Sequence, residues 1–183
     1  MPESAFYDVG PLEKVAVNLF YGWGYNFYRK ENQLRADDLL IRSKVGWLLG
    51  SARKSVETAE QEYRREFLPP PSRDKPRQDA GAVAKAQALE RLSRAIGALL
   101  GQISAQPTPE NDRMTQRYRQ EAETLQRLIE SDHKLVGQAE LLRSMVAQKN
   151  GTWLVENNAA LQEGLTAIGE TLASRQLLLF PVA

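Results

Sequence analysis

The sequence predicts an all-α protein of about five helices, arranged mainly as an antiparallel helical bundle in one domain over residues 1–183. Apolar residues recur every three or four positions over most of the chain, which is the period of an amphipathic helix. Breaks that contain proline or glycine separate these periodic stretches. Only one segment also has the pattern of a β-strand, and it has no second strand with which to pair.

That segment is the predicted first helix, residues 11–30, which follows a leader, residues 1–10, expected to lie on the surface. Its residues also alternate at period two, and Gly22 and Gly24 each cost about 1 kcal/mol in a helix interior, so a strand is the alternative. The helix would have two apolar stripes: Ala16, Leu19, Phe20, Trp23 and Phe27 on one side, and Val17, Tyr21, Tyr25 and Tyr28 on the other.

Two apolar stripes on one helix predict two contact surfaces. The helix is either central and surrounded by the others, or it docks a partner through its tyrosine edge, Tyr21, Tyr25 and Tyr28. We favour the central position because large aromatic side chains contribute most when they are buried.

The second helix has the clearest amphipathic pattern. It follows a polar turn over residues 31–38 and ends at Leu68, with a stripe of Ile41, Val45, Leu48, Ala52, Val56, Ala59, Tyr63 and Phe67. Prolines 69–71 cannot continue a helix, so residues 69–79 are predicted to form an exposed linker and the longest crossover.

The third helix is predicted over residues 80–104, with a stripe of Leu89, Leu92, Ile96, Leu99 and Ile103. Its glycine pair, Gly97 and Gly101, resembles the pair Gly46 and Gly50 in the second helix. Both pairs lie beside the main stripe, and we expect another helix to approach closely there.

The fourth helix is predicted to begin near Glu110, with a stripe of Tyr118, Ala122, Leu125, Ile129, Val136, Ala139, Leu142 and Val146. Asp132 falls inside this stripe, which requires either a partner for the carboxylate or a kink recapped at Ser131 and Asp132. Residues 149–151 stop this helix, and Thr152 is expected to cap the fifth, whose stripe runs from Leu154 to Leu179 before Pro181.

Composition limits the functional classes. A chain of 183 residues with 26% charged residues has a globular profile, and its net charge of +1 gives no electrostatic argument for direct binding of nucleic acid or an anionic membrane. The chain has no cysteine, no secretory signal pattern and no apolar run of the roughly 20 residues needed to span a membrane, so a soluble cytoplasmic protein without a cofactor is expected.

The only histidine, His133, lies in two short patterns. Glu130 and His133 have the ExxH spacing of ferritin-like dimetal bundles, but such a site needs a second pair and two further glutamates, so no metal is expected. The segment from His133 to Gly137 resembles the HxLKG core of histidine phosphotransfer domains, with Val136 in place of a lysine. That resemblance implies a phospho-accepting role for an exposed His133.

The C-terminal segment from Gln176 to Phe180, QLLLF, resembles the QLxLF pentapeptide by which bacterial replication and repair proteins bind the sliding clamp. The resemblance implies an extended peptide with the Gln176 amide held by hydrogen bonds and with Leu177, Leu179 and Phe180 filling an apolar pocket. Packing of Leu179 in the fifth helix is the competing interpretation.

No pattern in the chain has the strength of a catalytic signature, so the sequence favours a protein that is not an enzyme. The leading hypothesis is a helical adaptor or accessory subunit that acts through protein partners, as a homo-oligomer or in a hetero-complex. The alternatives are a replication or repair accessory protein that binds a sliding clamp through Gln176 to Phe180, and a phosphotransfer domain that uses His133.

Overall fold

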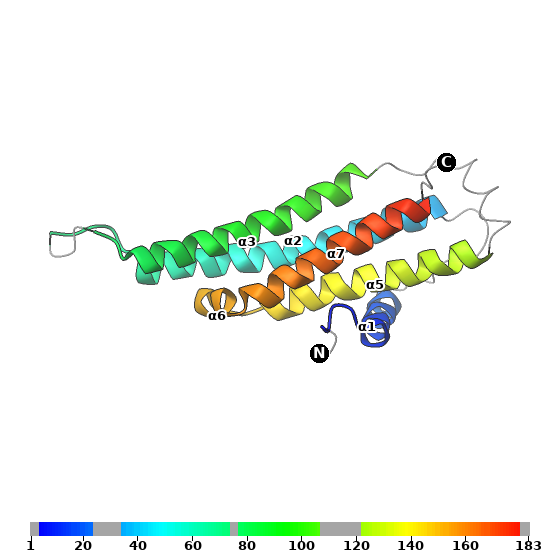
Figure 1. Ribbon diagram of the computed structural model, residues 1–183, viewed down its shortest axis with the longest axis horizontal. Coiled ribbons are helices and arrows are strands. Elements are labelled where there is room, and N and C mark those ends of the chain that lie inside the picture. Colours follow the sequence, from blue (N-terminus) through cyan, green and yellow to red (C-terminus); the bar gives the residue numbers. More distant parts are fainter. Residues whose placement is uncertain (1–3, 24–33, 74–76, 107–121, 180–183) are drawn as a thin grey trace.

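The computed structural model describes residues 4–23, 34–73, 77–106 and 122–179, and only the backbone is described for 34–37, 122–125 and 179. These residues form six helices: α1 (Val9–Gly22), α2 (Leu34–Phe67), α3 (Ala80–Ala105), α5 (Ala122–Val146), α6 (Gly151–Glu156) and α7 (Asn158–Leu179) (Figure 1). No strand occurs in this part of the chain, which confirms the all-α class. None of its helices is both long and apolar enough to cross a membrane.

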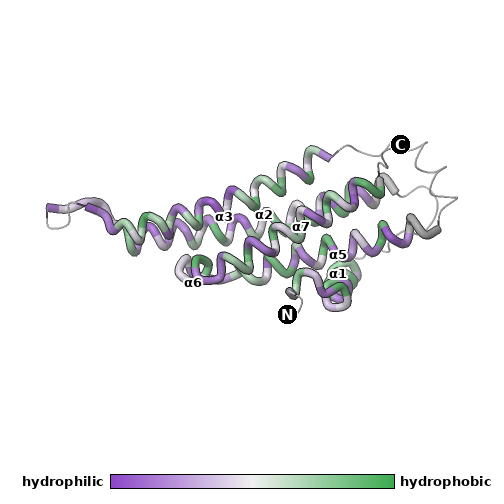
Figure 2. The backbone as a smooth tube through the Cα atoms, in the orientation of Figure 1, coloured by the Kyte–Doolittle hydropathy of each residue, from purple (hydrophilic) through white to green (hydrophobic). Residues whose placement is uncertain are grey.

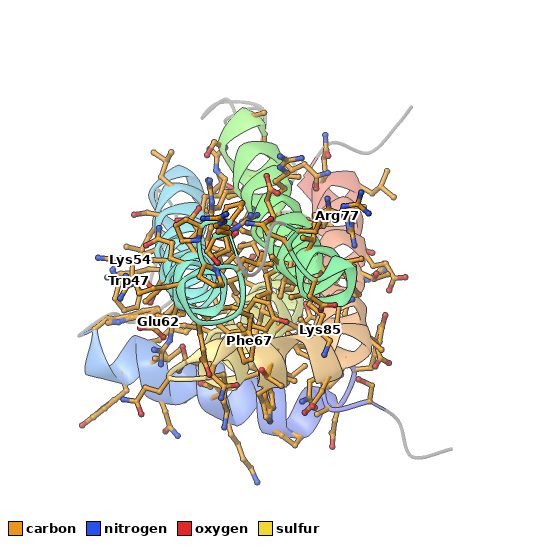
Figure 3. All side chains as sticks on the ribbon, turned by 90° about the vertical axis from the view of Figure 1, so that its left-hand side faces the viewer. Trp47, Lys54, Glu62, Phe67, Arg77 and Lys85 are labelled. Atoms are coloured by element: carbon orange, nitrogen blue, oxygen red, sulfur yellow. The ribbon has the colours of Figure 1, made fainter. Side chains whose placement is uncertain are left out.

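The four long helices form a bundle in which each has two neighbours. The α2–α3 and α5–α7 pairs are antiparallel, and the two pairs pack side by side, so that α2 runs parallel to α5 and α3 runs parallel to α7 (Figure 1). Seen along the bundle, α1 crosses below these helices rather than joining them (Figure 3). The short α6 turns the chain from α5 into α7.

The predicted apolar stripes build the core. Hydrophobic and hydrophilic segments alternate along the long helices (Figure 2), and one cluster of buried residues draws on all six helices. It includes the predicted positions Ile41, Val45, Leu48, Ala52, Val56, Ala59, Tyr63, Leu89, Leu92, Ile96, Leu99, Ile103, Val136, Ala139, Leu142 and Val146. Two predicted positions lie outside this cluster: Phe67, which is exposed at the end of α2, and Ile129, which is half-buried in α5 beside the buried Leu128.

The central position favoured for the first helix is wrong. α1 ends at Gly22 and lies on the outside of the bundle across α5, with Phe20 buried and Tyr21 exposed. Gly137 of α5 explains the close crossing: a Cβ there would lie 2.4 Å from the Leu12 carbonyl oxygen, so only glycine admits the α1 backbone. The structure does not describe residues 24–33.

The leader does not lie wholly on the surface as predicted. The Phe6 ring is buried against Gly164 of α7, where a Cβ would lie 2.5 Å from the ring. The buried Gln138 side chain of α5 donates a hydrogen bond to the Phe6 carbonyl at 2.9 Å. The segment before α1 is therefore anchored to both α5 and α7.

Several helix ends differ from the predictions. α2 begins at Leu34, inside the predicted polar turn. Asn150 rather than Thr152 caps α6, through a hydrogen bond from the Trp153 amide at 2.9 Å, and a break at Asn157 divides the predicted fifth helix into α6 and α7. Gln148 takes the left-handed conformation (φ 57°) that ends α5.

The glycine pairs of α2 and α3 do not mark close helix contacts. A Cβ at Gly46, Gly50 or Gly101 would meet nothing within 4 Å, and at Gly97 it would meet the Arg53 guanidinium at 3.3 Å. Close packing depends instead on glycines in α5, α6 and α7.

Candidate functional sites

Aromatic side chains gather where the end of α1 meets α2. Trp23, at the C-terminal cap of α1, packs edge to face on buried Phe20 with ring centroids 5.3 Å apart. The Lys44 ammonium of α2 lies 4.6 Å from the centre of the Trp23 ring, within the range of a cation–π interaction. Trp47 follows Lys44 by one helical turn. We call Tyr21, Trp23, Lys44 and Trp47 the aromatic corner.

The two outer members of the aromatic corner are strongly exposed. Tyr21 is 88% exposed and Trp47 is 61% exposed, and the Trp47 ring points away from the bundle (Figure 3). Val17, one turn before Tyr21, is also exposed, so the part of the tyrosine edge that the structure describes faces solvent. Tyr25 and Tyr28 lie outside the described residues.

The C-terminal candidate starts on the surface. Gln176 is exposed, Leu177 is 61% exposed, and both belong to the last turns of α7. Gln176 also lines an open groove of about 320 Å³ between the ends of α3 and α7, together with Gln102, Ala105 and Leu172. The Leu179 side chain and Phe180 lie outside the described part of the chain.

His133 lies under α1. Its side chain is 15% exposed, its Nδ1 atom is 3.7 Å from the Glu13 carboxylate, and its ring centroid is 6.1 Å from that of Phe20. Glu13 and Phe20 of α1 thus cover the His133 side chain, which would have to be accessible for phosphotransfer. Within the described residues no group of three or more potential metal ligands occurs at His133 or elsewhere.

A buried ionic cluster joins three helices of the bundle. Arg175 of α7 donates from Nε to Asp132 of α5 at 2.5 Å and from Nη1 to Asp38 of α2 at 2.7 Å. Asp38 also pairs with Arg42 at 2.8 Å, and Arg42 Nη1 donates to the Gln106 carbonyl at 2.6 Å, just past the end of α3. Arg175, Asp132 and Asp38 are all buried.

The charges of this cluster depend on one another. Burial on its own would lower the pKa of Arg175, but the adjacent Asp132 and Asp38 carboxylates outweigh burial and raise that pKa above its ordinary value. Arg175 therefore stays cationic, and its fork shape lets one guanidinium serve two carboxylates. The cluster fixes the relative positions of α2, α5 and α7 at this end of the bundle.

Asp132 stands out in the sequence, but its partners do not. Asp132 is buried within a continuous α5, so the partnered carboxylate is the correct alternative and the kink is not. Arg175 lies between Leu172 and Leu179 at the spacing of the α7 stripe, and Asp38 lies one turn before Ile41. Asp38, Asp132 and Arg175 are each a charged residue at a core position of a helix, and this shared feature is the signal in the sequence that could have predicted the cluster.

The chain matches no protein-family model, and comparison with curated proteins and with solved structures gives no match.

Proposed function

We propose that this chain is a non-enzymatic, cytoplasmic helical adaptor or accessory subunit that binds a protein partner through the aromatic corner. The observation that carries the proposal is the exposure of Tyr21 and Trp47 beside an anchored Trp23. Tryptophan and tyrosine are the residues that most often dominate binding energy in protein interfaces, because each buries a large area with few rotatable bonds.

The chemistry of the aromatic corner indicates what its partner presents. Two exposed rings fit an apolar groove or the apolar face of a helix. Lys44 lies over the Trp23 ring, and its positive charge favours an acidic side chain on the partner at that point. Packing on Phe20 and the cation–π contact restrain the Trp23 ring before binding, which lowers the entropy lost on association.

The test compares two variants in a quantitative pull-down from native lysate. Tyr21→Ser combined with Trp47→Ser removes the exposed rings, and Phe67→Ser removes an exposed aromatic ring at the far end of α2 as the matched control. We expect partners to be lost with the first variant and kept with the second, at unchanged helix content and melting temperature. An identical partner list for the double variant and wild type would refute this function.

The sliding-clamp hypothesis is the second candidate, and the exposure of Gln176 and Leu177 at the end of α7 favours it. To bind an extended peptide site, the last turn of α7 would unwind, which is least costly at a helix terminus. Deletion of residues 176–183 should leave the melting temperature nearly unchanged and abolish binding to a purified bacterial clamp. Retained clamp binding, or a large loss of stability that places this segment in the core, would reject this role.

A further inference from the structure

The side of the bundle formed by α3 and α7 is its most open side. The groove of about 320 Å³ lies between the C-terminal parts of these two helices. Gly169 of α7 lies beside Leu99 of α3, since a Cβ at Gly169 would lie 3.8 Å from the leucine side chain. The α1 helix does not cover this side, because it crosses α5.

The outer surface of this side is built mainly from small side chains at helical spacing. On α3 the exposed and half-exposed positions follow each other at steps of four and three, and on α7 they do the same. We call these residues the α3–α7 face: Ala84, Ala88, Arg91, Ala95, Ala98, Gln102 and Ala105 from α3, with Ala159, Gln162, Thr166, Gly169, Ala173 and Gln176 from α7. Alternating steps of this kind are the seam pattern of helices that pack on other helices.

Opposite charges flank the two edges of the α3–α7 face. The α3 edge is basic, with exposed Arg91 and with Arg94, which also pairs with Glu90 of the same helix. The α7 edge is acidic, with exposed Glu163 and with Glu170, which also accepts a hydrogen bond from Tyr7 at 3.1 Å. Arg175 is the only basic residue of α7, and it is buried in the ionic cluster. The face is therefore electrostatically complementary to itself.

We propose that two copies of this chain associate through the α3–α7 face, about a two-fold axis that lies in the interface and runs along the helices. This axis places α3 of each copy along α7 of the other and keeps every residue at its own level. Gly169 is level with Leu99, so six residues earlier in these parallel helices Glu163 is level with Ser93, between Arg91 and Arg94. Each Glu163 then faces Arg91 and Arg94 of the other copy.

The size of the face suits such a dimer. α7 has 22 residues and is about 33 Å long. Two adjacent helices about 10 Å wide give a face of about 650 Å² per copy, which is close to the roughly 800 Å² per partner of a standard interface. Small side chains allow the two pairs of helices to approach closely. The flanking charges favour pairing of α3 in one copy with α7 in the other, and disfavour pairing of α3 with α3.

The experiment measures mass by light scattering and sedimentation over a concentration series. Wild-type chain should reach about twice 20.6 kDa, and raising the salt concentration should weaken the association. Arg91→Glu and Glu163→Lys should each weaken the dimer about tenfold or more, because each makes the two symmetry-related pairs between residues 91 and 163 repulsive. Lys54→Glu, an equal charge reversal on the outer face of α2, should leave it unchanged.

Mixing the two charge variants is the decisive measurement. In a heterodimer of Arg91→Glu with Glu163→Lys both pairs between residues 91 and 163 are again opposite in charge, so the mixture should recover the dimer that neither variant forms alone. Circular dichroism checks that every variant keeps its helix content. A wild-type chain that stays monomeric at every concentration, variants that dimerise like the wild type, or a mixture that fails to recover the dimer would each overturn the proposal. Dimerisation is independent of the aromatic corner, so Tyr21→Ser with Trp47→Ser should remain dimeric.

Discussion

Replacing Arg175 with methionine tests the role of the buried ionic cluster. Methionine keeps most of the length of the side chain but removes the guanidinium that reaches Asp132 and Asp38. Asp38 keeps its pair with Arg42 at 2.8 Å, so the main loss falls on the fully buried Asp132 carboxylate. Removing one partner of a buried ion pair destabilises a protein by about 3–5 kcal/mol.

That free energy translates into a large change in thermal stability. For a chain of this size each kcal/mol shifts the melting temperature by about 2–4 °C, so we expect Arg175→Met to melt about 6–20 °C below the wild type at pH 7. Protonation relieves a buried carboxylate that has lost its guanidinium partner, and the difference in stability should therefore narrow as the pH falls from 7 to about 4. Calorimetry or circular dichroism at several pH values measures both effects.

A second substitution separates loss of the ion pair from loss of packing. Arg175→Met combined with Asp132→Leu removes both charges, and a buried pair replaced by apolar groups is often close to neutral. We expect the double variant to recover most of the lost stability at pH 7. If Arg175→Met is as stable as the wild type, or if its deficit is the same at pH 4 and pH 7, the electrostatic explanation fails.

Three further predictions concern helix packing, capping and titration. Gly137→Ala forces a Cβ into the α1 backbone and should destabilise by about 1–3 kcal/mol in a denaturant titration, whereas Gly101→Ala, which meets nothing within 4 Å, should stabilise by up to about 1 kcal/mol. Asp79→Ala removes the 2.7 Å cap on the Ala82 amide of α3 and should lower the melting temperature by about 2–4 °C, from a loss of about 1 kcal/mol. Burial and the hydrogen bond to Glu170 raise the pKa of the Tyr7 phenol, so its absorbance titration should lie above that of free tyrosine, and Glu170→Gln should lower this pKa. The stability that this contact adds to the folded state is complete below the ordinary tyrosine pKa near 10 and is lost as the pH rises through the pKa of the folded state.

The parts of the fold that follow from local periodicity could be predicted from the sequence. Apart from Phe67, the α2 and α3 stripes are buried as expected, because amphipathic spacing and the prolines at 69–71 depend only on nearby residues. The position of α1 could not be predicted in this way. It depends on Gly137, more than a hundred residues away, whose missing side chain lets the α1 backbone cross α5.

The candidate sites also divide into features that local sequence patterns reveal and features that depend on how distant helices pack. Asp132 is conspicuous in the sequence because a carboxylate interrupts an apolar stripe, but its partner Arg175 lies in another helix and only the packing brings the two together. The second stripe of α1 was visible as a pattern, and its exposure at Tyr21 follows from the crossing over α5. The charge pattern of the α3–α7 face could not be recognised from the sequence, because it depends on which helices are neighbours and on which residues of α3 and α7 lie at the same level.

The anchoring of Phe6 has a consequence for the order of events during synthesis. Its two contacts, Gln138 and Gly164, leave the ribosome more than a hundred residues after it. Phe6 and Phe20 therefore stay exposed after α1 has been made, until α5 and α7 provide the surfaces that bury them. Aggregation of nascent chains and chaperone capture should be greatest for truncated products that stop before α7, and a full-length chain should release the chaperone as its N-terminal segment docks.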